Sequence, residues 1–179
     1  MKNLISFLGA LFFVTTAFAQ TADIPISGKT NKICFQRVIT TQGTNTEVFN
    51  RIAGEWLRST YKNPTAVITG NDGSTITGKH NIQLDCTDEN KTKCPKVNYK
   101  FTVEVREGRI RYTLTDFTLD TSKSTKSLYP IENWLNKEDP QYTEVWGNYL
   151  EQIASFAEKW GANLEEKVQP EQTVEEEEW

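Results

Sequence analysis

The segment 96–119 constrains the fold of this chain most strongly, because two runs of alternating apolar and polar residues in it flank the dipeptide Glu107-Gly108. Period-two alternation of β-branched and aromatic residues is typical of strands with one buried face. A turn at Glu107-Gly108 pairs apolar residues with apolar residues on one face and polar residues with polar residues on the other, so one register accounts for both faces of the hairpin. The predicted pairs are Val105–Ile110, Val103–Tyr112 and Phe101–Leu114 on the apolar face, and Glu104–Arg111 and Thr102–Thr113 on the polar face.

Residues 1–19 have the composition of a secretory signal peptide. Lys2 precedes an apolar run at 4–14, and Ala17-Phe18-Ala19 forms a small-x-small cleavage site. The run is too short to span a membrane, and a buried N-terminal helix is the alternative. We therefore expect cleavage before Gln20, export to the periplasm or out of the cell, and no integral membrane segment after cleavage.

The charge of the chain is concentrated near its end. Leaving out Lys2, Lys167 and the seven glutamates from position 165 onward reduces the 20 basic and 24 acidic residues of the chain to 18 and 17. Residues 165–179 are acidic and almost without apolar periodicity, so we expect a disordered tail there. The nearly neutral body gives no electrostatic reason to bind nucleic acid or an anionic membrane.

Residues 32–164 are expected to form a single domain after a polar lead-in at 20–31. The expected elements are a strand at 32–41, a helix at 44–61, a short strand at 65–70, a strand at 74–85, the hairpin at 96–119, a helical turn at 131–137 and a long helix at 140–164. Because the helices carry apolar stripes and the sheet has one apolar face, the simplest architecture is a two-layer α+β domain with the other sheet face solvated.

Two of these elements carry further expectations. The inward face of the first strand stays open, since Ile33, Phe35 and Ile39 compete with Cys34 and Val38. The helix at 44–61 begins with a capping box, T-x-x-E at 44–47. Gly54 weakens that helix by about 1 kcal/mol relative to Ala, so we expect close packing on the sheet there.

The chain offers little machinery for catalysis or metal binding. It has no G-x-S-x-G motif, and His80, its one histidine, is expected to pack on the inward face of its strand. A zinc site needs four ligands and usually more than one histidine when cysteines are few. Carboxylate pairs such as Asp85 with Asp88 lie in or beside loops and are expected to be solvated. We therefore expect a non-catalytic domain that needs no metal and no cofactor.

Basic residues near the hairpin are the candidate ligand-binding group. Arg106, Arg109 and Arg111 cluster near the hairpin tip, where guanidinium groups can meet a carboxylate or a phosphate. The alternative is a solvated sheet face with a Glu104–Arg111 ion pair. Lys100 lies on the same predicted face, so Lys100, Arg109 and Arg111 are taken as the candidate site.

Three segments, in order, resemble a known family. They are 44–56, with its T-x-x-E-V-F start and Trp56; the strand 75–79; and 99–117, with its E-G-R-I-R-Y-T-L-T-D-F core. They are similar to the secreted bacterial proteins grouped as domain of unknown function 4468, described as having a TATA-binding-protein-like fold. This resemblance implies a five-stranded antiparallel sheet in spatial order 2-3-4-5-1 with helices on one face. It implies no activity.

The fold name suggests DNA binding, but the predicted open face does not. A minor-groove saddle needs basic residues and apolar wedges, whereas this face is polar and of mixed charge. We expect no nucleic-acid partner.

The implied strand order also bears on the cysteines. It separates Cys34, on the first strand, from Cys94 by at least two neighbouring strands, or roughly 10 Å, which is too far for a disulfide. Cys86 and Cys94 flank one loop, so we expect them to pair and Cys34 to stay free. Pairing Ile82 with Tyr99 and Leu84 with Val97 would place Cys86 opposite Pro95.

Three hypotheses of function remain. The preferred one is an exported, non-catalytic domain that binds a protein or a small ligand at the cell envelope. The alternatives are an uncharacterised envelope enzyme, hydrolase-like, and a structural accessory of an envelope assembly.

Overall fold

The computed structural model describes residues 24–86, 94–120 and 130–170. The predicted signal peptide at 1–19 lies outside them. The elements are β1 (Phe35–Thr40), α1 (Asn45–Arg51), the π-helical turn η1 (Ile52–Trp56), α2 (Leu57–Thr60), α3 (Pro64–Val67), β2 (Ile68–Asn71), β3 (Thr75–Gln83), β4 (Lys96–Arg106), β5 (Arg109–Leu119), the 3-10 helix η2 (Ile131–Leu135) and α4 (Glu144–Val168).

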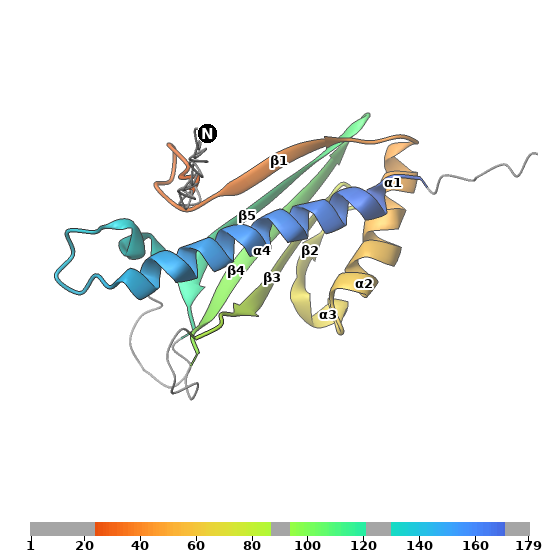
Figure 1. The fold of residues 1–179 in the computed structure, drawn as a ribbon. Coiled ribbons are helices and arrows are strands. Elements are labelled where there is room, and N and C mark those ends of the chain that lie inside the picture. Colours follow the sequence, from red (N-terminus) through yellow and green to blue (C-terminus); the bar gives the residue numbers. More distant parts are fainter. Residues whose placement is uncertain (1–23, 87–93, 121–129, 171–179) are drawn as a thin grey trace, which may run out of the picture.

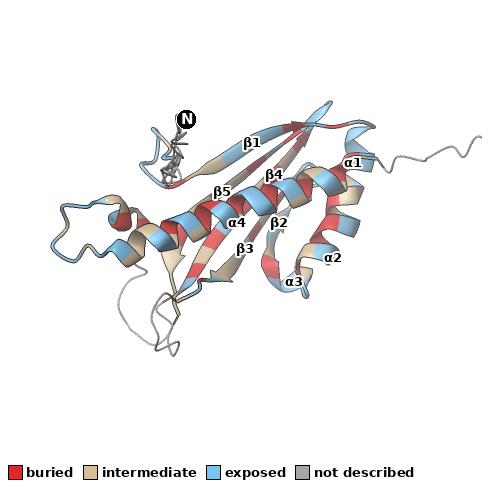
Figure 2. Ribbon diagram, in the orientation of Figure 1, coloured by how far each residue is buried: buried red, intermediate tan, exposed pale blue. Residues whose placement is uncertain are grey.

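The five strands form one antiparallel sheet in the order β1-β5-β4-β3-β2. This confirms the expected order and fold class. Figure 1 shows α4 lying across one face of the sheet, beside the helical segment α1 to α2. Buried residues line the strands and the inner side of α4 (Figure 2). The other face, which we call the open face, carries no helix in the part of the chain that the structure describes.

The central hairpin has the predicted register. β4 and β5 pair Val105 with Ile110 and Phe101 with Leu114 on the buried face, and Glu104 with Arg111 on the open face. The alternation therefore identified both the partners and the face of each side chain, as expected where one face of a sheet is buried.

The predicted register between β3 and β4 is wrong by two residues. Ile82 pairs with Val97, not with Tyr99. In the observed register Gly78 faces Phe101, and a Cβ added at Gly78 would lie 2.3 Å from Phe101 Cζ. The ring therefore fills the space that the missing side chain leaves, and this contact favours the observed register. A shift of two residues keeps the same face buried, so alternation alone could not detect it.

The disulfide predicted between Cys86 and Cys94 is present, with Cα atoms 5.0 Å apart. In the corrected register Leu84, not Cys86, lies across from Pro95, and the Leu84 N–H donates to the Pro95 carbonyl at 3.0 Å. Cys86 thus lies beyond the end of β3, where the chain is free to meet Cys94. Cys34 is a free thiol.

The first helical segment begins as predicted, with reciprocal hydrogen bonds between Thr44 and Glu47. The expectation at Gly54 is wrong, because a Cβ added there would meet nothing within 4 Å. Gly54 lies in the π-helical turn η1, in which Ile52 and Trp56 are fully buried. The packing on the sheet therefore comes from its neighbours.

The long helix begins and ends about four residues later than predicted, at Glu144 and Val168 instead of 140 and 164. Its last turn is held by tertiary contacts. Val168 is fully buried, and its carbonyl accepts a hydrogen bond from Arg51 Nε at 3.0 Å. Residues 165–168 are therefore helical rather than part of a disordered tail, and residues 171–179 lie outside the described part.

The structure also corrects one short element and settles the orientation of another. Asn63 caps the one-turn helix α3, so only the second half of the predicted strand at 65–70 is extended. On β1 the open question is resolved: Ile39 is buried, whereas Val38 is 56% exposed on the open face.

The core lies between the sheet and the helices. Trp56, Phe101, Tyr112 and Ile153 are all buried, as the matching stripes predict. Trp56 packs edge-on against Trp160 of α4, with ring centroids 4.9 Å apart. In the described ranges, no helix is both long and apolar enough to cross a bilayer.

Candidate functional site

Positive charge predominates on the open face. Alternate residues of β3, β4 and β5 point to this side, because successive side chains of a strand alternate between faces. The exposed cations there are Lys79, Lys96, Lys100, Arg106, Arg109 and Arg111. Two carboxylates, those of Glu104 and Asp116, are bound to cations of this face. The two carboxylates divide the face into two clusters.

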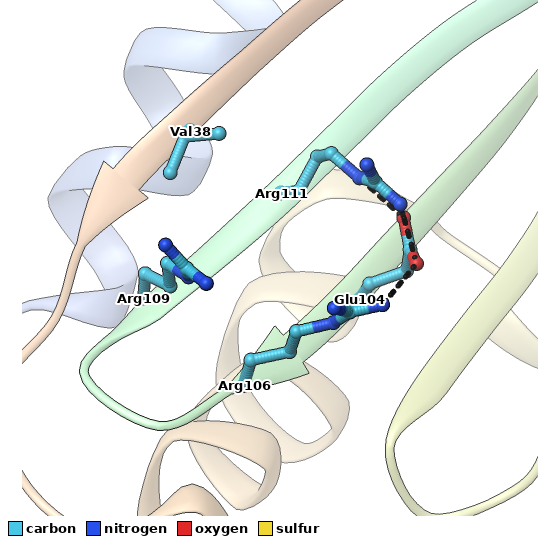
Figure 3. Close-up of a pocket in the computed structure, with 5 residues that line it drawn as sticks. All are labelled: Val38, Glu104, Arg106, Arg109 and Arg111. Carbon is cyan, nitrogen blue, oxygen red and sulfur yellow. Dashed lines mark hydrogen bonds and ion pairs between the residues drawn. The ribbon is translucent and has the colours of Figure 1, made fainter.

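The first cluster, which we call the arginine surface, consists of Arg106, Arg109 and Arg111 with Glu104 and Val38. These residues line a pocket of about 230 Å³ on the open face (Figure 3). They come from β1, β4 and β5 beside the hairpin turn, so the turn brings the three guanidinium groups to one end of the sheet.

Glu104 is the carboxylate that interacts with the arginines of this cluster. Arg111 binds Glu104 through two hydrogen bonds, Nε to Oε2 at 2.6 Å and Nη2 to Oε1 at 2.8 Å. Arg106 lies 3.8 Å from the same carboxylate. This confirms the predicted Glu104–Arg111 pair. Because one negative charge is shared between two guanidinium groups, the cluster keeps a net positive charge.

Arg109 is the member with no acidic partner among the described residues. It lies opposite Thr40, while Val38 lies opposite Arg111, so β1 contributes no charge to the cluster. In Figure 3 Glu104 bridges Arg106 and Arg111, and Arg109 stands apart from that network. A guanidinium presents N–H donors in a rigid fork that matches a carboxylate or a phosphate. Arg109 is therefore available to bind an anionic group.

The second cluster surrounds Asp116, at an irregularity in β5. The β4–β5 register shifts between Asn98 and Lys100, and Asp116 has a φ of 54°. A bulge with its first residue in the left-handed region normally carries glycine, and it re-aims the side chain at that point. Here it places the Asp116 carboxylate on the open face, where it binds the ammonium groups of Lys32 and Lys100.

These contacts set the electrostatics of the second cluster. Hydrogen bonds from Lys100 and then Lys32 lower the pKa of Asp116, and the hydrogen bond to Asp116 raises the pKa of Lys32. Lys100 also lies directly opposite Lys79, a repulsive pairing that the Asp116 carboxylate offsets. A hollow of about 330 Å³ adjoins the cluster, lined in part by Lys79, Lys100 and Asp116.

The three candidate residues predicted from the sequence do not line a common pocket. Arg109 and Arg111 line the arginine surface, and Lys100 lines the hollow beside Asp116. Lys100 precedes Glu104 by four residues on β4, or roughly 13 Å at strand spacing. Sequence reasoning missed Asp116, although the apolar alternation changes phase between Leu114 and Phe117, which is the signal of a bulge.

The one histidine of the chain makes packing contacts in the structure. His80 packs as predicted, its ring 5.1 Å from that of Tyr61 and its Nδ1 2.8 Å from the Asn81 carbonyl oxygen. Within residues 24–86, 94–120 and 130–170, no group of three His, Cys, Asp or Glu side chains is placed to hold a metal ion.

Residues 35–120 match the family described as "Domain of unknown function (DUF4468) with TBP-like fold", so the expected resemblance is confirmed over β1 to β5. The fold is shared with two crystal structures. One is a TBP-like protein from Parabacteroides distasonis, 18% identical, with a TM-score of 0.62 over 81% of this chain and 96% of that one. The other is a DUF4468 family protein from Bacteroides ovatus, 16% identical, with a TM-score of 0.64 over 84% and 91%. No curated protein matches the chain.

Proposed function

We propose that this protein is an exported, non-catalytic domain that binds an anionic group of a partner protein or small ligand on the arginine surface. The observation that carries the proposal is the charge balance of that surface. Arg106, Arg109 and Arg111 line one pocket with Glu104 as its only carboxylate, and Arg109 has no acidic partner in the described residues.

The chemistry of the surface favours a carboxylate-rich ligand. The guanidinium N–H groups of Arg109 have no acidic partner in the described chain, and Arg106 is 3.8 Å from Glu104, which is too far for a hydrogen bond. Both arginines can therefore donate a hydrogen bond to a ligand oxygen. Val38, 56% exposed beside them, offers an apolar contact to the rest of the ligand. Because exposed ion pairs contribute only about 0.2–1 kcal/mol each and are screened by salt, we expect weak, salt-sensitive binding to any single group.

We propose an acidic polypeptide, and not nucleic acid, as the ligand. Proteins that use a curved sheet to bind the minor groove insert apolar side chains between base pairs. The open face carries threonines, amides and charged groups, and Val38 is its exposed large hydrophobic residue. A ligand that needs only charge and hydrogen bonds fits this face better.

Calorimetric titration with an acidic peptide tests the proposal. A hexaglutamate peptide should bind the wild-type protein, and the Arg106→Gln, Arg109→Gln double variant should bind at least about tenfold more weakly, equivalent to about 1.4 kcal/mol. Arg58→Gln is the matched control, because Arg58 is an exposed arginine on α2. Equal affinity of the double variant, or tighter binding of a DNA duplex than of the peptide, would contradict the proposal.

Export is part of the same proposal. It is supported by the signal-like composition of residues 1–19 and by the Cys86–Cys94 disulfide, a bond typical of oxidising compartments. N-terminal sequencing of the protein recovered from its native host should begin at Gln20. Recovery of mature protein that still begins at Met1 would show that the leader is not removed.

A further inference from the structure

The described part of the chain ends beside the arginine surface. Gln169 follows the last residue of α4, and its Nε2 donates to the Thr40 carbonyl at 3.0 Å. Thr40 is the residue of β1 that pairs with Arg109 of β5. Paired residues on neighbouring strands have Cα atoms about 4.5–5.5 Å apart. The last described residues therefore lie near the end of β1 that pairs with Arg109.

We propose that residues 171–179 bind the arginine surface of the same chain. This segment carries Glu171, glutamates at 175–178 and Trp179. Its charge is the complement of the surface, and its nine residues span up to about 30 Å when extended, which is enough to pass the edge of β1. Trp179 adds a ring that can stack on a guanidinium group.

The charged groups around the exit point direct the segment toward the open face. Glu47 and Glu107 line a hollow beside α1, and they repel a chain of glutamates. Arg37, on the covered side of β1, is already bound to Glu165 of α4 at 3.1 Å. Arg51 donates to the carbonyls of Val168 and Gln42. In the described chain, Arg109 is therefore the arginine at this end of the sheet that neither a carboxylate nor a carbonyl binds.

The docked segment would compete with an external ligand. A tether of this length gives an effective concentration of the order of millimolar, so it lowers the apparent affinity for an acidic partner by about two- to fivefold when the segment itself binds with a millimolar constant. The inference uses the arginine surface of the proposed function, but it does not require an external partner to exist.

Paramagnetic relaxation in the chain from Gln20 to Trp179 tests the docking. A nitroxide is attached at Thr173→Cys in a Cys34→Ser background, and broadening of the backbone amides is measured in 50 mM salt. Val38 and Arg109 should be broadened strongly. The matched control replaces Glu171 and the glutamates at 175–178 by Gln, which keeps the tether and removes the charge. In this control, and in 0.5 M salt, the broadening should fall by at least about half.

Each outcome decides the matter. Equal broadening in the control would show that the tether alone brings the label near, and would overturn the proposal. Broadening that appears only between a spin-labelled copy and a separate isotope-labelled copy would also overturn it, because the contact would then join two chains. If the segment docks but the charge-neutralised protein binds no hexaglutamate, the docking stands and the proposed function fails. If the neutralised protein binds hexaglutamate and the segment does not dock, the proposed function stands and the docking proposal fails.

Discussion

Gly161 of α4 lies directly against the ring of Tyr112 on β5, and a Cβ added at Gly161 would be 2.1 Å from the Tyr112 hydroxyl oxygen. The helix rests on the sheet at this contact, because Gly161 and Tyr112 are both buried. Gly161→Ala should therefore destabilise the protein by about 1–3 kcal/mol, despite the better helix propensity of Ala. Urea unfolding followed by circular dichroism measures the change.

Gly54 provides the matched control. It also lies in a helical segment, but nothing surrounds its Cβ position within 4 Å. Gly54→Ala should stabilise the protein by up to about 1 kcal/mol. A loss at Gly54 as large as that at Gly161 would mean that helix geometry, and not the contact with Tyr112, sets both values.

A buried hydroxyl of Tyr61 connects the helical layer to the sheet. It accepts a hydrogen bond from Trp160 Nε1 at 2.9 Å and shares another with the Tyr99 hydroxyl at 3.2 Å. Tyr61→Phe breaks both bonds, so we expect a loss of about 1–3 kcal/mol in unfolding free energy. Tyr99→Phe breaks only one and should cost about 0.5–1.5 kcal/mol. Denaturant titration of both variants would contradict this description if Tyr99→Phe were the more costly.

The Asp116 ion pairs should make stability depend on pH in the acid range. Hydrogen bonds from Lys100 and Lys32 lower the pKa of Asp116 below its ordinary 3.8. A depressed pKa contributes stability that is complete above the unfolded-state pKa and is lost as the pH falls through the folded-state pKa. The unfolding free energy of Asp116→Asn should therefore be lower than that of wild type by a constant amount from pH 7 to about pH 5. Below pH 3.8 this difference in unfolding free energy should become smaller.

The contribution of the backbone conformation at Asp116 to stability can be measured separately from that of its charge. Asn tolerates a φ of 54° nearly as well as Asp, whereas Ala does not. Asp116→Ala should consequently cost about 1 kcal/mol more than Asp116→Asn at every pH. A difference between wild type and Asp116→Asn that stays unchanged down to pH 2 would show that the two lysines do not act on the carboxylate.

The thiols should differ in reactivity. Non-reducing peptide mapping should recover Cys86 joined to Cys94, and Cys34 as a single alkylated peptide. Burial raises the pKa of Cys34, so its thiolate fraction at pH 8 is low and iodoacetamide should modify it more slowly than a free cysteine peptide. A crosslinked peptide that contains Cys34 would contradict both the pairing and the strand order.

Most of the sheet could be predicted from the sequence, because burial of one face makes apolar and polar residues alternate along each strand. Glu104 and Arg111 could be paired from that alternation alone, with the turn at Gly108 fixing the register. The register of β3 could not be fixed in this way. A shift of two residues keeps the face, and the contact that selects the register, Phe101 over Gly78, depends on three-dimensional packing.

The site was only partly predictable for a related reason. Arg109 and Arg111 follow each other on one strand, so their proximity is local and visible in the sequence. Lys100 shares their face, but it lies four residues before Glu104 on β4 and binds Asp116 instead. That carboxylate faces the open side because of a bulge, a backbone irregularity without a side-chain motif of its own. The end of α4 escaped prediction because its last turn is held by Arg51, a residue far away in the sequence.

The central claim is that an anionic ligand binds at the arginine surface and not elsewhere on the sheet. Side-chain Nε–H resonances of ¹⁵N-labelled arginines, followed during titration with hexaglutamate, test it most directly. The resonance of Arg109 should shift most, those of Arg106 and Arg111 should shift less, and that of Arg58 on α2 should stay in place. A titration in which Arg58 shifts as much as Arg109, or in which the amides of Lys79 and Lys100 move while Arg109 does not, would contradict the claim.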